Sequence, residues 1–316
     1  LAKEYSIPNL CMAGGVALNC VANGKILRSK AFKDIWIQPA SGDAGGALGA
    51  ALALWHKELN MPRKVNPNDA MKGSYLGPSY DQNSIEKELL DCGAKFDAVT
   101  EDDMIEQTAQ ALSDGAAIGW FQGRMEFGPR SLGGRSILGD PRSEKMQKTL
   151  NLKVKYRESF RPFAPSVLSE DVSEWFEADY DSPYMLMVDD VKKDKRIEMT
   201  KEEESLFGID KLNIKRSSIP AVTHVDYSAR IQTVHKQTNP KYHKLITKFK
   251  EKTGCSVVVN TSFNVRGEPI VCTPKDAFRC FMGTGLDLLV IGNCVLIKEE
   301  QEKSLIENYR EKYELD

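Results

Sequence analysis

The sequence predicts an α/β fold, because strands and helices alternate along it, glycine-rich turns separate them, and a second alternating set follows a polar linker. Its 316 residues are 41% hydrophobic and 28% charged, with a formal net charge of −2. That composition is typical of globular proteins, and the length suggests two domains. The near-neutral charge argues against a protein built mainly to bind nucleic acid. No apolar run of about 18 residues occurs, so no membrane-spanning helix and no membrane partner are predicted.

The first segment, residues 1–58, repeats a strand, a glycine turn and a helix. LCMAGGVALN predicts a short strand running into glycines, followed by a helix over residues 21–30. FKDIWIQP predicts the second strand, and SGDAGGALGAALALWHKEL a loop that opens into an Ala/Leu-rich helix. The chain begins without Met and without a signal-peptide pattern. We therefore expect a portion of a longer protein that continues before residue 1.

Residues 59–72 are polar, contain two prolines and lack periodicity, which predicts an interdomain linker. A second α/β set follows it. Helices are expected at 101–115, 242–254 and 273–285, and strands at 116–123, 255–260, 287–292 and 294–299. The segment 190–217 is rich in charges of both signs and is expected to be a solvated loop. Residues 299–316 are expected to form a charged surface helix.

The seven cysteines are odd in number and form no CxxC pair. Most lie in apolar runs, which indicates buried reduced thiols and a cytoplasmic protein. The four histidines form no HExxH motif and no Cys/His zinc spacing. We therefore expect no self-contained metal site in these residues.

The stretch GRMEFGPRSLGGRSILGDPR, residues 123–142, holds four arginines and five glycines around one glutamate. Glycines let a backbone turn sharply and approach a ligand closely. Arginine is well suited to bind phosphate or carboxylate, because its planar fork is always charged. Arg130 is the first candidate for an anion site and Arg135 the second. The alternative is a set of structural bridges to Glu126 and Asp140, which we favour for Arg124 and Arg142.

A second basic stretch, residues 151–168, contains Lys153, Lys155, Arg157 and Arg161 beside the segment FRPFAP. Its prolines fix the backbone rather than continue a helix. Cations gathered on such a backbone repel one another unless an anion compensates them. Arg230, in the predicted strand SARIQTV, adds another cation among apolar neighbours.

Polar side chains also follow the predicted strand CSVVVN. Open α/β sheets often bind ligands beyond the carboxyl ends of parallel strands. A turn that caps the strand is the alternative interpretation. The candidates are Asn260, Thr261, Ser262 and Asn264.

Two glycine loops in the first segment each lead toward a helix. Backbone N–H groups at a helix start favour phosphate, and a carboxylate there can hold a metal ion. Gly14 and Gly15 in the first loop are candidate cofactor-binding residues, and Asp43 in the second is a candidate metal ligand. Asp43 could instead cap its helix.

Taken in order, the blocks MAGGVALN, SGDAGGALGAAL, GPRSLGGRSIL, FRPFAPSVL, ARIQTV and NTSFNVRGEPIV strongly resemble the O-carbamoyltransferases. This family includes the nodulation-factor and antibiotic-tailoring carbamoyltransferases, and the resemblance covers essentially the whole chain. It implies an α/β fold made of two modules. Residues 1–58 would be the C-terminal part of an actin-like (ASKHA) domain whose first half is missing, and residues 73–316 a YrdC-like domain.

The resemblance also implies a reaction. The YrdC-like domain activates carbamoyl phosphate with ATP to a carbamoyl-adenylate, and the actin-like domain moves the carbamoyl group onto a hydroxyl of a small-molecule acceptor. A divalent metal, iron or magnesium, belongs to the full-length protein, with Asp43 at the position of its aspartate ligand. The histidine ligands are absent, so these residues should not bind the metal properly. Arg130, Lys155, Arg161, Arg230 and Ser262 match the positions that bind carbamoyl phosphate and nucleotide phosphates, with Asn260 and Asn264 as neighbours.

No residue has the setting of a covalent nucleophile, and Ser262 lacks an evident histidine partner, so a hydrogen-bonding role is expected for it. The alternatives are a YrdC-like module that binds RNA or a nucleotide without transfer chemistry, and an actin-fold sugar kinase suggested by the glycine loops. The acceptor and the oligomeric state stay open, a homodimer among the assemblies considered.

Overall fold

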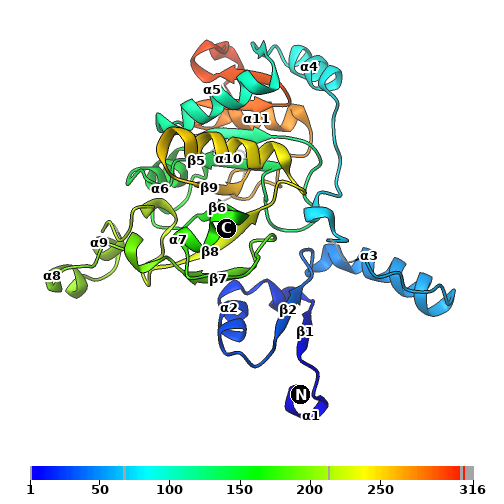
Figure 1. The fold of residues 1–316 in the computed structure, drawn as a ribbon. Helices are drawn as coiled ribbons and strands as arrows, with labels where there is room; N and C mark the ends of the chain where they lie inside the picture. The colour runs from blue at the N-terminus through cyan, green and yellow to red at the C-terminus, as the bar shows by residue number, and fades with distance from the viewer. Residues whose placement is uncertain (1, 67–68, 213, 307–308, 310–316) are drawn as a thin grey trace.

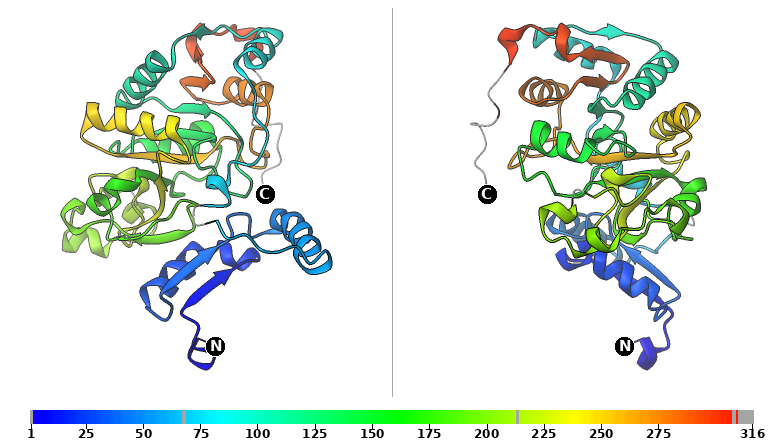
Figure 2. Two further views of the ribbon diagram at one scale, coloured as in Figure 1. Left: turned by 45° about the vertical axis from the view of Figure 1, so that its right-hand side comes forward. Right: turned by 90° about the vertical axis from the view of Figure 1, so that its left-hand side faces the viewer.

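The computed structural model of the protein describes residues 2–66, 69–212, 214–306 and 309. It confirms a mixed α/β fold with a two-stranded sheet near the N-terminus and a nine-stranded sheet after it (Figure 1). The chain runs from the small sheet to the large sheet through residues 59–66 and 69–75 (Figure 2).

The small sheet pairs β1 (Asn9–Met12) in parallel with β2 (Asp34–Ile37). Two helices follow these strands as expected, α2 (Cys20–Arg28) and α3 (Asp43–Ala53), and a short α1 (Ala2–Tyr5) precedes them. The Asn19 side chain accepts a hydrogen bond from the Ala22 N–H and thereby caps α2. A π-helical turn at Leu54–Glu58 extends α3. None of the α3 side chains is buried, and Figure 1 shows this helix extending away from the rest of the chain.

The large sheet has the strand order β3-β11-β10-β4-β5-β9-β6-β8-β7. Only two of its neighbouring pairs are parallel, β10 with β4 and β6 with β8. Its strands are β3 (Asp97–Ala98), β4 (Ile118–Phe121), β5 (Arg135–Gly139), β6 (Ala164–Leu168), β7 (Met187–Asp190), β8 (Ser228–Val234), β9 (Val257–Ser262), β10 (Leu288–Ile291) and β11 (Cys294–Ile297).

Helices cover both faces of this sheet, α5 and α10 on one side and α6 and α11 on the other, with α4 beside α11 (Figure 2). The sequence predicted α5, α10 and α11 because each carries an apolar stripe at helical spacing and a recognisable end. Gly254, for example, ends α10 in the left-handed conformation. The helices are α4 (Gln82–Asp91), α5 (Glu101–Ser113), α6 (Met146–Thr149), α7 (Val172–Trp175), α10 (Pro240–Thr253) and α11 (Pro274–Gly283).

Two predictions about charged segments are corrected. The 190–217 segment carries short helices, α8 (Lys201–Ser205) and α9 (Ile209–Leu212), and it ends with Arg216 and Ser217 buried. It is therefore not a solvated loop throughout, because its end packs back on the core. The helix expected over 299–316 is wrong for the described residues 299–306, which form 3-10 turns at Lys298–Glu300 and Lys303–Leu305. Residues 307–308 and 310–316 lie outside the described part of the chain.

The first segment packs directly on β7 of the large sheet. The Asn23 amide is fully buried and donates to the Ala17 and Leu186 carbonyls, at 2.8 and 3.0 Å. Gly24 approaches the Val188 carbonyl so closely that a Cβ there would lie 2.2 Å from the oxygen. The Arg28 guanidinium reaches Asp189 at 3.2 Å. The residues on either side of the predicted linker are therefore in extensive contact.

All seven cysteines are free thiols. Cys20, Cys255, Cys280 and Cys294 are buried as expected, whereas Cys11 is exposed. No helix among the described residues has the length and apolar character needed to cross a membrane.

Candidate functional site

The lone glutamate of the arginine-rich stretch organises the loop around it. Glu126 is buried, and its Oε1 accepts hydrogen bonds from the backbone N–H groups of Leu132, Gly134 and Arg135 at 2.6, 2.7 and 3.3 Å. A carboxylate that receives several backbone donors holds the chain in one conformation. The interior of this loop is therefore filled by the protein's own anion, and its arginines are held around it.

Two glycines let this loop fit between its neighbours. Gly133 has φ +103, and a Cβ at this position would lie 2.3 Å from the ring of Tyr242. Gly128 has φ +142, and its Cβ would lie 2.9 Å from the Pro39 carbonyl oxygen. The second contact sets the loop against the segment that leads into α3. Only glycine satisfies both the backbone angle and the space at these positions.

Arg130 projects from this loop toward the first segment. Its Nη2 lies 3.3 Å from the Leu18 carbonyl oxygen and 3.6 Å from the Cys20 Sγ. Its Nε is buried and has no hydrogen-bond partner among the described residues. No carboxylate pairs with Arg130 in the described part of the chain, so a charged group with unused donors faces the junction of the two segments.

The other three arginines of the stretch have structural partners. Arg135 is fully buried, stacks 3.5 Å from the Phe121 ring and donates to carbonyl oxygens that include those of Gln122 and Pro78. Burial lowers its pKa to about 10. The structure therefore does not bring Arg135 to the anion site predicted for it. Arg142 binds Asp140 through two nitrogens and Arg124 donates to the Gly77 carbonyl, as the bridging interpretation predicts for Arg142.

Lys155 is buried, and its amine lies within hydrogen-bond distance of four oxygens at the end of β9 and just beyond it. Nζ donates to the carbonyl and Oγ of Ser262 and, at 2.9 and 2.8 Å, to the carbonyl and Oδ1 of Asn264. Ser262 Oγ in turn donates to Asn264 Oδ1 at 2.7 Å. Burial, followed by the charge of Arg157, lowers the pKa of Lys155 to about 7. The structure thus brings together three residues predicted for the site.

Three further guanidinium groups gather beside Lys155. Burial and the charges of Arg161, Arg230 and Arg266, opposed in part by Glu158, together lower the pKa of Arg157 to about 10. Glu158 is the carboxylate in ion-pair range here, 3.2 Å from Arg161 and 3.5 Å from Arg266. Arg161 is half-exposed and held by Glu158. Positive charge therefore exceeds negative charge in this part of the described chain.

Arg230, on β8, completes this group and lines a cavity of about 320 Å³. Burial lowers its pKa, and the neighbouring charge of Arg130 lowers it further. Two neighbouring arginines, neither of them ion-paired with a carboxylate in the described part of the chain, form a site that suits an anion. The cavity is lined by Leu18, Asn19, Cys20, Val21, Pro162, Phe163, Val188, His224 and Arg230.

Asn260 and Thr261 lie within β9 rather than beyond it, and both neighbours of β9 run antiparallel to it. Ser262 is the last residue of β9, so the prediction of polar residues beyond a parallel strand is wrong for all three, and of the four candidates Asn264 lies beyond the strand. The Asn260 amide is buried and donates to Ser131 O, Ser166 Oγ and Gln232 Oε1. Asn260 therefore supports the loop between β4 and β5 (residues 122–134, the arginine loop). Ser262 and Asn264 are the residues that reach Lys155.

The candidate residues of the first segment lie apart from this cluster. Gly14 and Gly15 are exposed at a four-residue 3-10 turn, Gly15–Leu18, and α2 begins beyond them with its own cap. Asp43 is exposed at the start of α3. No three His, Cys, Asp or Glu side chains gather as a cation site anywhere in the described ranges. The side chains present here do not make up a metal site around Asp43.

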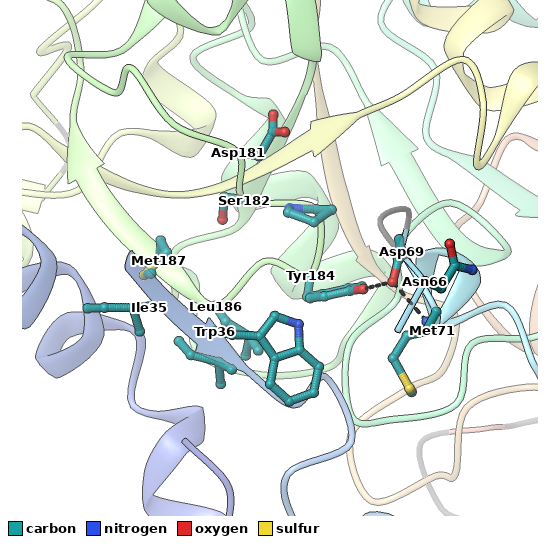
Figure 3. Close-up of a pocket in the computed structure, with 13 residues that line it drawn as sticks. Ile35, Trp36, Asn66, Asp69, Met71, Asp181, Ser182, Tyr184, Leu186 and Met187 are labelled. Atoms are coloured by element: carbon teal, nitrogen blue, oxygen red, sulfur yellow. Dashed lines mark hydrogen bonds between the residues drawn. The ribbon is translucent and has the colours of Figure 1, made fainter. Parts of the chain in front are cut away.

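A larger cavity, about 520 Å³, lies where β2 meets residues 66, 69–71 and 181–187. Figure 3 shows the Trp36 indole at its opening and the Tyr184 hydroxyl bonded to Asp69. Its lining is apolar with acidic groups at the rim, and none of the residues predicted for an anion site lines it. The arginine-lined cavity, although smaller, is therefore the candidate functional site.

Three residues of this site were not chosen from the sequence as site residues: Cys20, His224 and Arg266. The spacing of His224 from the other histidines does not fit a metal site, and the sequence gives no other signal for this residue. Arg266 lies in the stretch NVRGEP, where its positive charge is the feature that could have indicated an anion-binding role. Nothing in the sequence indicated that Cys20 would contact Arg130, because 110 positions separate them.

Comparisons with known proteins identify the family that this chain resembles over most of its length. Residues 109–298 match the family described as "Carbamoyltransferase C-terminus", and residues 1–52 match "Carbamoyltransferase N-terminus". An uncharacterized protein of Synechocystis sp. is 58% identical over 99% of this chain and 52% of its own length. Nodulation protein NolO of Bradyrhizobium diazoefficiens is 43% identical, over 92% and 49%. The 3'-hydroxymethylcephem-O-carbamoyltransferase of Streptomyces clavuligerus is 30% identical, over 90% and 48%. The chain thus spans about half the length of these relatives.

Proposed function

Because this chain belongs to the carbamoyltransferase family, we propose that its arginine-lined cavity binds carbamoyl phosphate and ATP and forms a carbamoyl-adenylate. Water attacks carbamoyl phosphate and releases inorganic phosphate and carbamate, a carbamate oxygen then attacks the α-phosphorus of ATP to form the carbamoyl-adenylate, and pyrophosphate departs. In the longer protein the carbamoyl group then passes to a hydroxyl of a small-molecule acceptor. The Streptomyces relative is named as an O-carbamoyltransferase of a hydroxymethyl compound, and this name supports the proposed acceptor class.

The observation that carries the proposal is the excess of positive charge at one place. Burial and neighbouring arginines lower the pKa of Arg157 and of Arg230, with Arg230 among the neighbours of Arg157 and Arg130 the neighbour of Arg230, and the carboxylate of Glu158 is shared by Arg161 and Arg266. Gathering such groups is unfavourable unless a ligand supplies negative charge. The two substrates together carry several phosphate groups, which meet that requirement.

The residues of the proposed site have different roles in the reaction. Arg130 and Arg230 would hold phosphate oxygens and stabilise the charge that develops on them. Lys155, fixed by Ser262 and Asn264, would add a positive charge whose strength depends on its protonation. Ser262 has Lys155 and Asn264 as its side-chain partners, so it contributes a hydrogen bond rather than an acyl-enzyme. No step is assigned to a metal ion, since the residues around Asp43 do not form a site for one.

The test is pyrophosphate exchange into ATP that depends on carbamoyl phosphate. Arg230→Ala should lower its rate at least about 100-fold, the scale of losing one preorganised donor. Arg124→Ala, which removes an exposed guanidinium that donates to the Gly77 carbonyl, is the matched control and should keep most of the rate. Arg161→Ala should have a smaller effect than Arg230→Ala, because its side chain is 47% exposed and paired with Glu158.

Full exchange activity in Arg230→Ala would contradict the proposal. Salt-dependent RNA binding by a chain that does not respond to carbamoyl phosphate would favour the alternative of an RNA-binding module.

A further inference from the structure

His224 lies in the same cavity as Arg230, on the turn that leads into β8. Its Nδ1 is 3.0 Å from the Ser228 Oγ. Its Nε2 has no hydrogen-bond partner among the described residues. The ring therefore lines this cavity and carries one polar atom that the fold does not use.

The neighbouring residues decide which ring nitrogen carries the proton. Ser228 Oγ donates its hydrogen to Asp226 Oδ1 at 2.6 Å, and the same oxygen of Asp226 accepts from the Ser228 backbone N–H at 3.1 Å. With its proton committed, Ser228 Oγ can only accept from the imidazole. Nδ1 therefore carries the hydrogen, and Nε2 presents a lone pair.

The electrostatic surroundings keep this ring neutral near pH 7. Burial lowers the pKa of His224, Arg230 and Arg216 lower it further, and Asp226 raises it in part. The other charged or titratable groups on the elements that face the ring are Cys20, Lys25, Arg28, Asp190 and Lys211. Among them the cations outnumber the carboxylates, which agrees with an unprotonated imidazole.

A lone-pair acceptor is unusual in this cavity. Arg230 offers only donors, and Pro162, Phe163 and Val188 are apolar. Asn19 Oδ1 already accepts from the Ala22 N–H. Of the described side chains that line the cavity, His224 therefore provides the uncommitted nitrogen or oxygen acceptor.

Arginines alone recognise a phosphate and do not distinguish the group attached to it. Carbamoyl phosphate and acetyl phosphate have similar shapes, but the carbamoyl group carries an NH₂ donor where the acetyl group carries a methyl. A site with an acceptor beside the phosphate-binding arginines favours the carbamoyl compound, because a methyl group leaves that acceptor unpaired.

We propose that His224 is the specificity-determining residue for the carbamoyl group, its Nε2 accepting a hydrogen bond from the carbamoyl NH₂ while the arginines hold the phosphate. The inference rests on the proposed function of the cavity. Asp226 and Ser228 are positioning residues in this arrangement, since they fix the tautomer of His224 without touching the ligand.

The test uses two stable probes that differ only in this feature, phosphonoacetamide and acetonylphosphonate, whose affinities for the whole chain are measured by calorimetry. The chain should prefer phosphonoacetamide about fivefold, the value of one net hydrogen bond. His224→Phe should remove the preference while inorganic phosphate still binds. His243→Phe, a matched change on α10 where the imidazole faces Glu170, should keep the preference.

A measurement without any variant provides a second test. Lowering the pH through the pKa of His224, which burial holds below the ordinary value of about 6.5, protonates the ring and removes its lone pair, so the ratio of the two affinities should fall toward one. Taking the ratio cancels the titration of the phosphonate, which both probes share. This result decides the matter even if His224→Phe does not fold.

Equal affinity for the two probes in the unchanged chain would overturn the inference and leave the phosphate site intact. A preference that survives in folded His224→Phe would overturn it as well. If neither probe nor inorganic phosphate binds, the proposed function of the cavity fails, and the inference fails with it.

Discussion

At the scale of the residue, Lys155 shows how burial and charge create a reactive group. The residue is 4% exposed, and its amine lies near Arg157 and within hydrogen-bond distance of four oxygens of Ser262 and Asn264. The hydrogen bonds favour the charged form, whereas burial and the arginine disfavour it. The balance leaves a pKa of about 7, so this group changes charge in the range where an enzyme usually works.

This shift predicts a pH dependence of stability. Unfolding returns Lys155 to the ordinary pKa of about 10.4, so between pH 7 and that value the unfolded chain binds more protons than the folded chain. The contribution of this group to the free energy of unfolding must then rise with pH across this window. From pH 7 to pH 9 the rise should be about 2 kcal/mol, and it should be absent in Lys155→Met.

The measurement is urea unfolding at both pH values in a buffer free of phosphate. Lys153→Met, at an exposed neighbouring position, is the control and should show the same rise as the unchanged chain. An equal rise in Lys155→Met would show that the amine keeps an ordinary pKa in the folded protein.

The sequence identified Arg130, Arg230, Lys155, Ser262 and Asn264 because charged and amide residues stand out in stretches rich in glycine, proline or apolar residues. It could not separate Arg130 from Arg135. Both follow glycines in one loop, and only the folded chain shows that Arg135 points at Gln122 O and Pro78 O whereas Arg130 points at Leu18. Likewise the role of His224 depends on Ser228 and Asp226, whose bonding no spacing rule reveals.

At the scale of the element, the arginine loop between β4 and β5 is held by close packing as well as by Glu126. Gly133 stands against the Tyr242 ring, and Trp120 donates from its indole to the Gly133 carbonyl at 2.9 Å. The loop thereby connects a strand, a helix and the site residue Arg130. Its shape is a property of these neighbours and not of the loop alone.

Gly133→Ala tests how far the loop depends on this packing. The added Cβ would lie 2.3 Å from the Tyr242 ring, and φ +103 is strained for alanine. Gly115→Ala is the matched control, because Gly115 has φ +90 and open space around it. Gly133→Ala should lower the free energy of unfolding by at least about 2 kcal/mol more than the control does.

The readout is the midpoint of thermal or urea unfolding for both variants, together with the affinity for inorganic phosphate. We expect phosphate affinity to fall in Gly133→Ala, since Arg130 moves with the loop. Equal losses in the two variants would mean that the backbone angle accounts for the whole effect and that Tyr242 yields without cost.

The elements themselves were largely predictable, because α5, α10 and α11 show helical periodicity with clear ends, and β4 and β10 are short apolar runs. Strand direction was not. β9 lies between β5 and β6 and runs antiparallel to both, a pairing that depends on connections far apart in sequence. That is why Asn260, expected at a ligand-binding strand end, lies buried within the sheet.

At the scale of the whole molecule, the site spans the junction between the first segment and the large sheet. Leu18 and Cys20 come from the first segment and contact Arg130, while Arg230 and His224 come from the large sheet and its approach. The wall that the first segment contributes stays in place only while α2 is held against β7. The Asn23 amide, which bonds Ala17 and Leu186 together, provides that connection.

Asn23→Ala should therefore affect stability and ligand binding together. It leaves two carbonyls without a donor at a fully buried position, which should cost about 1–3 kcal/mol of the free energy of unfolding. Because Leu18 and Cys20 then lose their fixed position, the affinity for inorganic phosphate should fall as well, measured by calorimetry at a temperature where the variant is folded. Asn83→Ala, on the exposed surface of α4, is the control and should change neither quantity. A loss of stability with unchanged phosphate affinity would show that Arg130 and Arg230 form the site without the wall from the first segment.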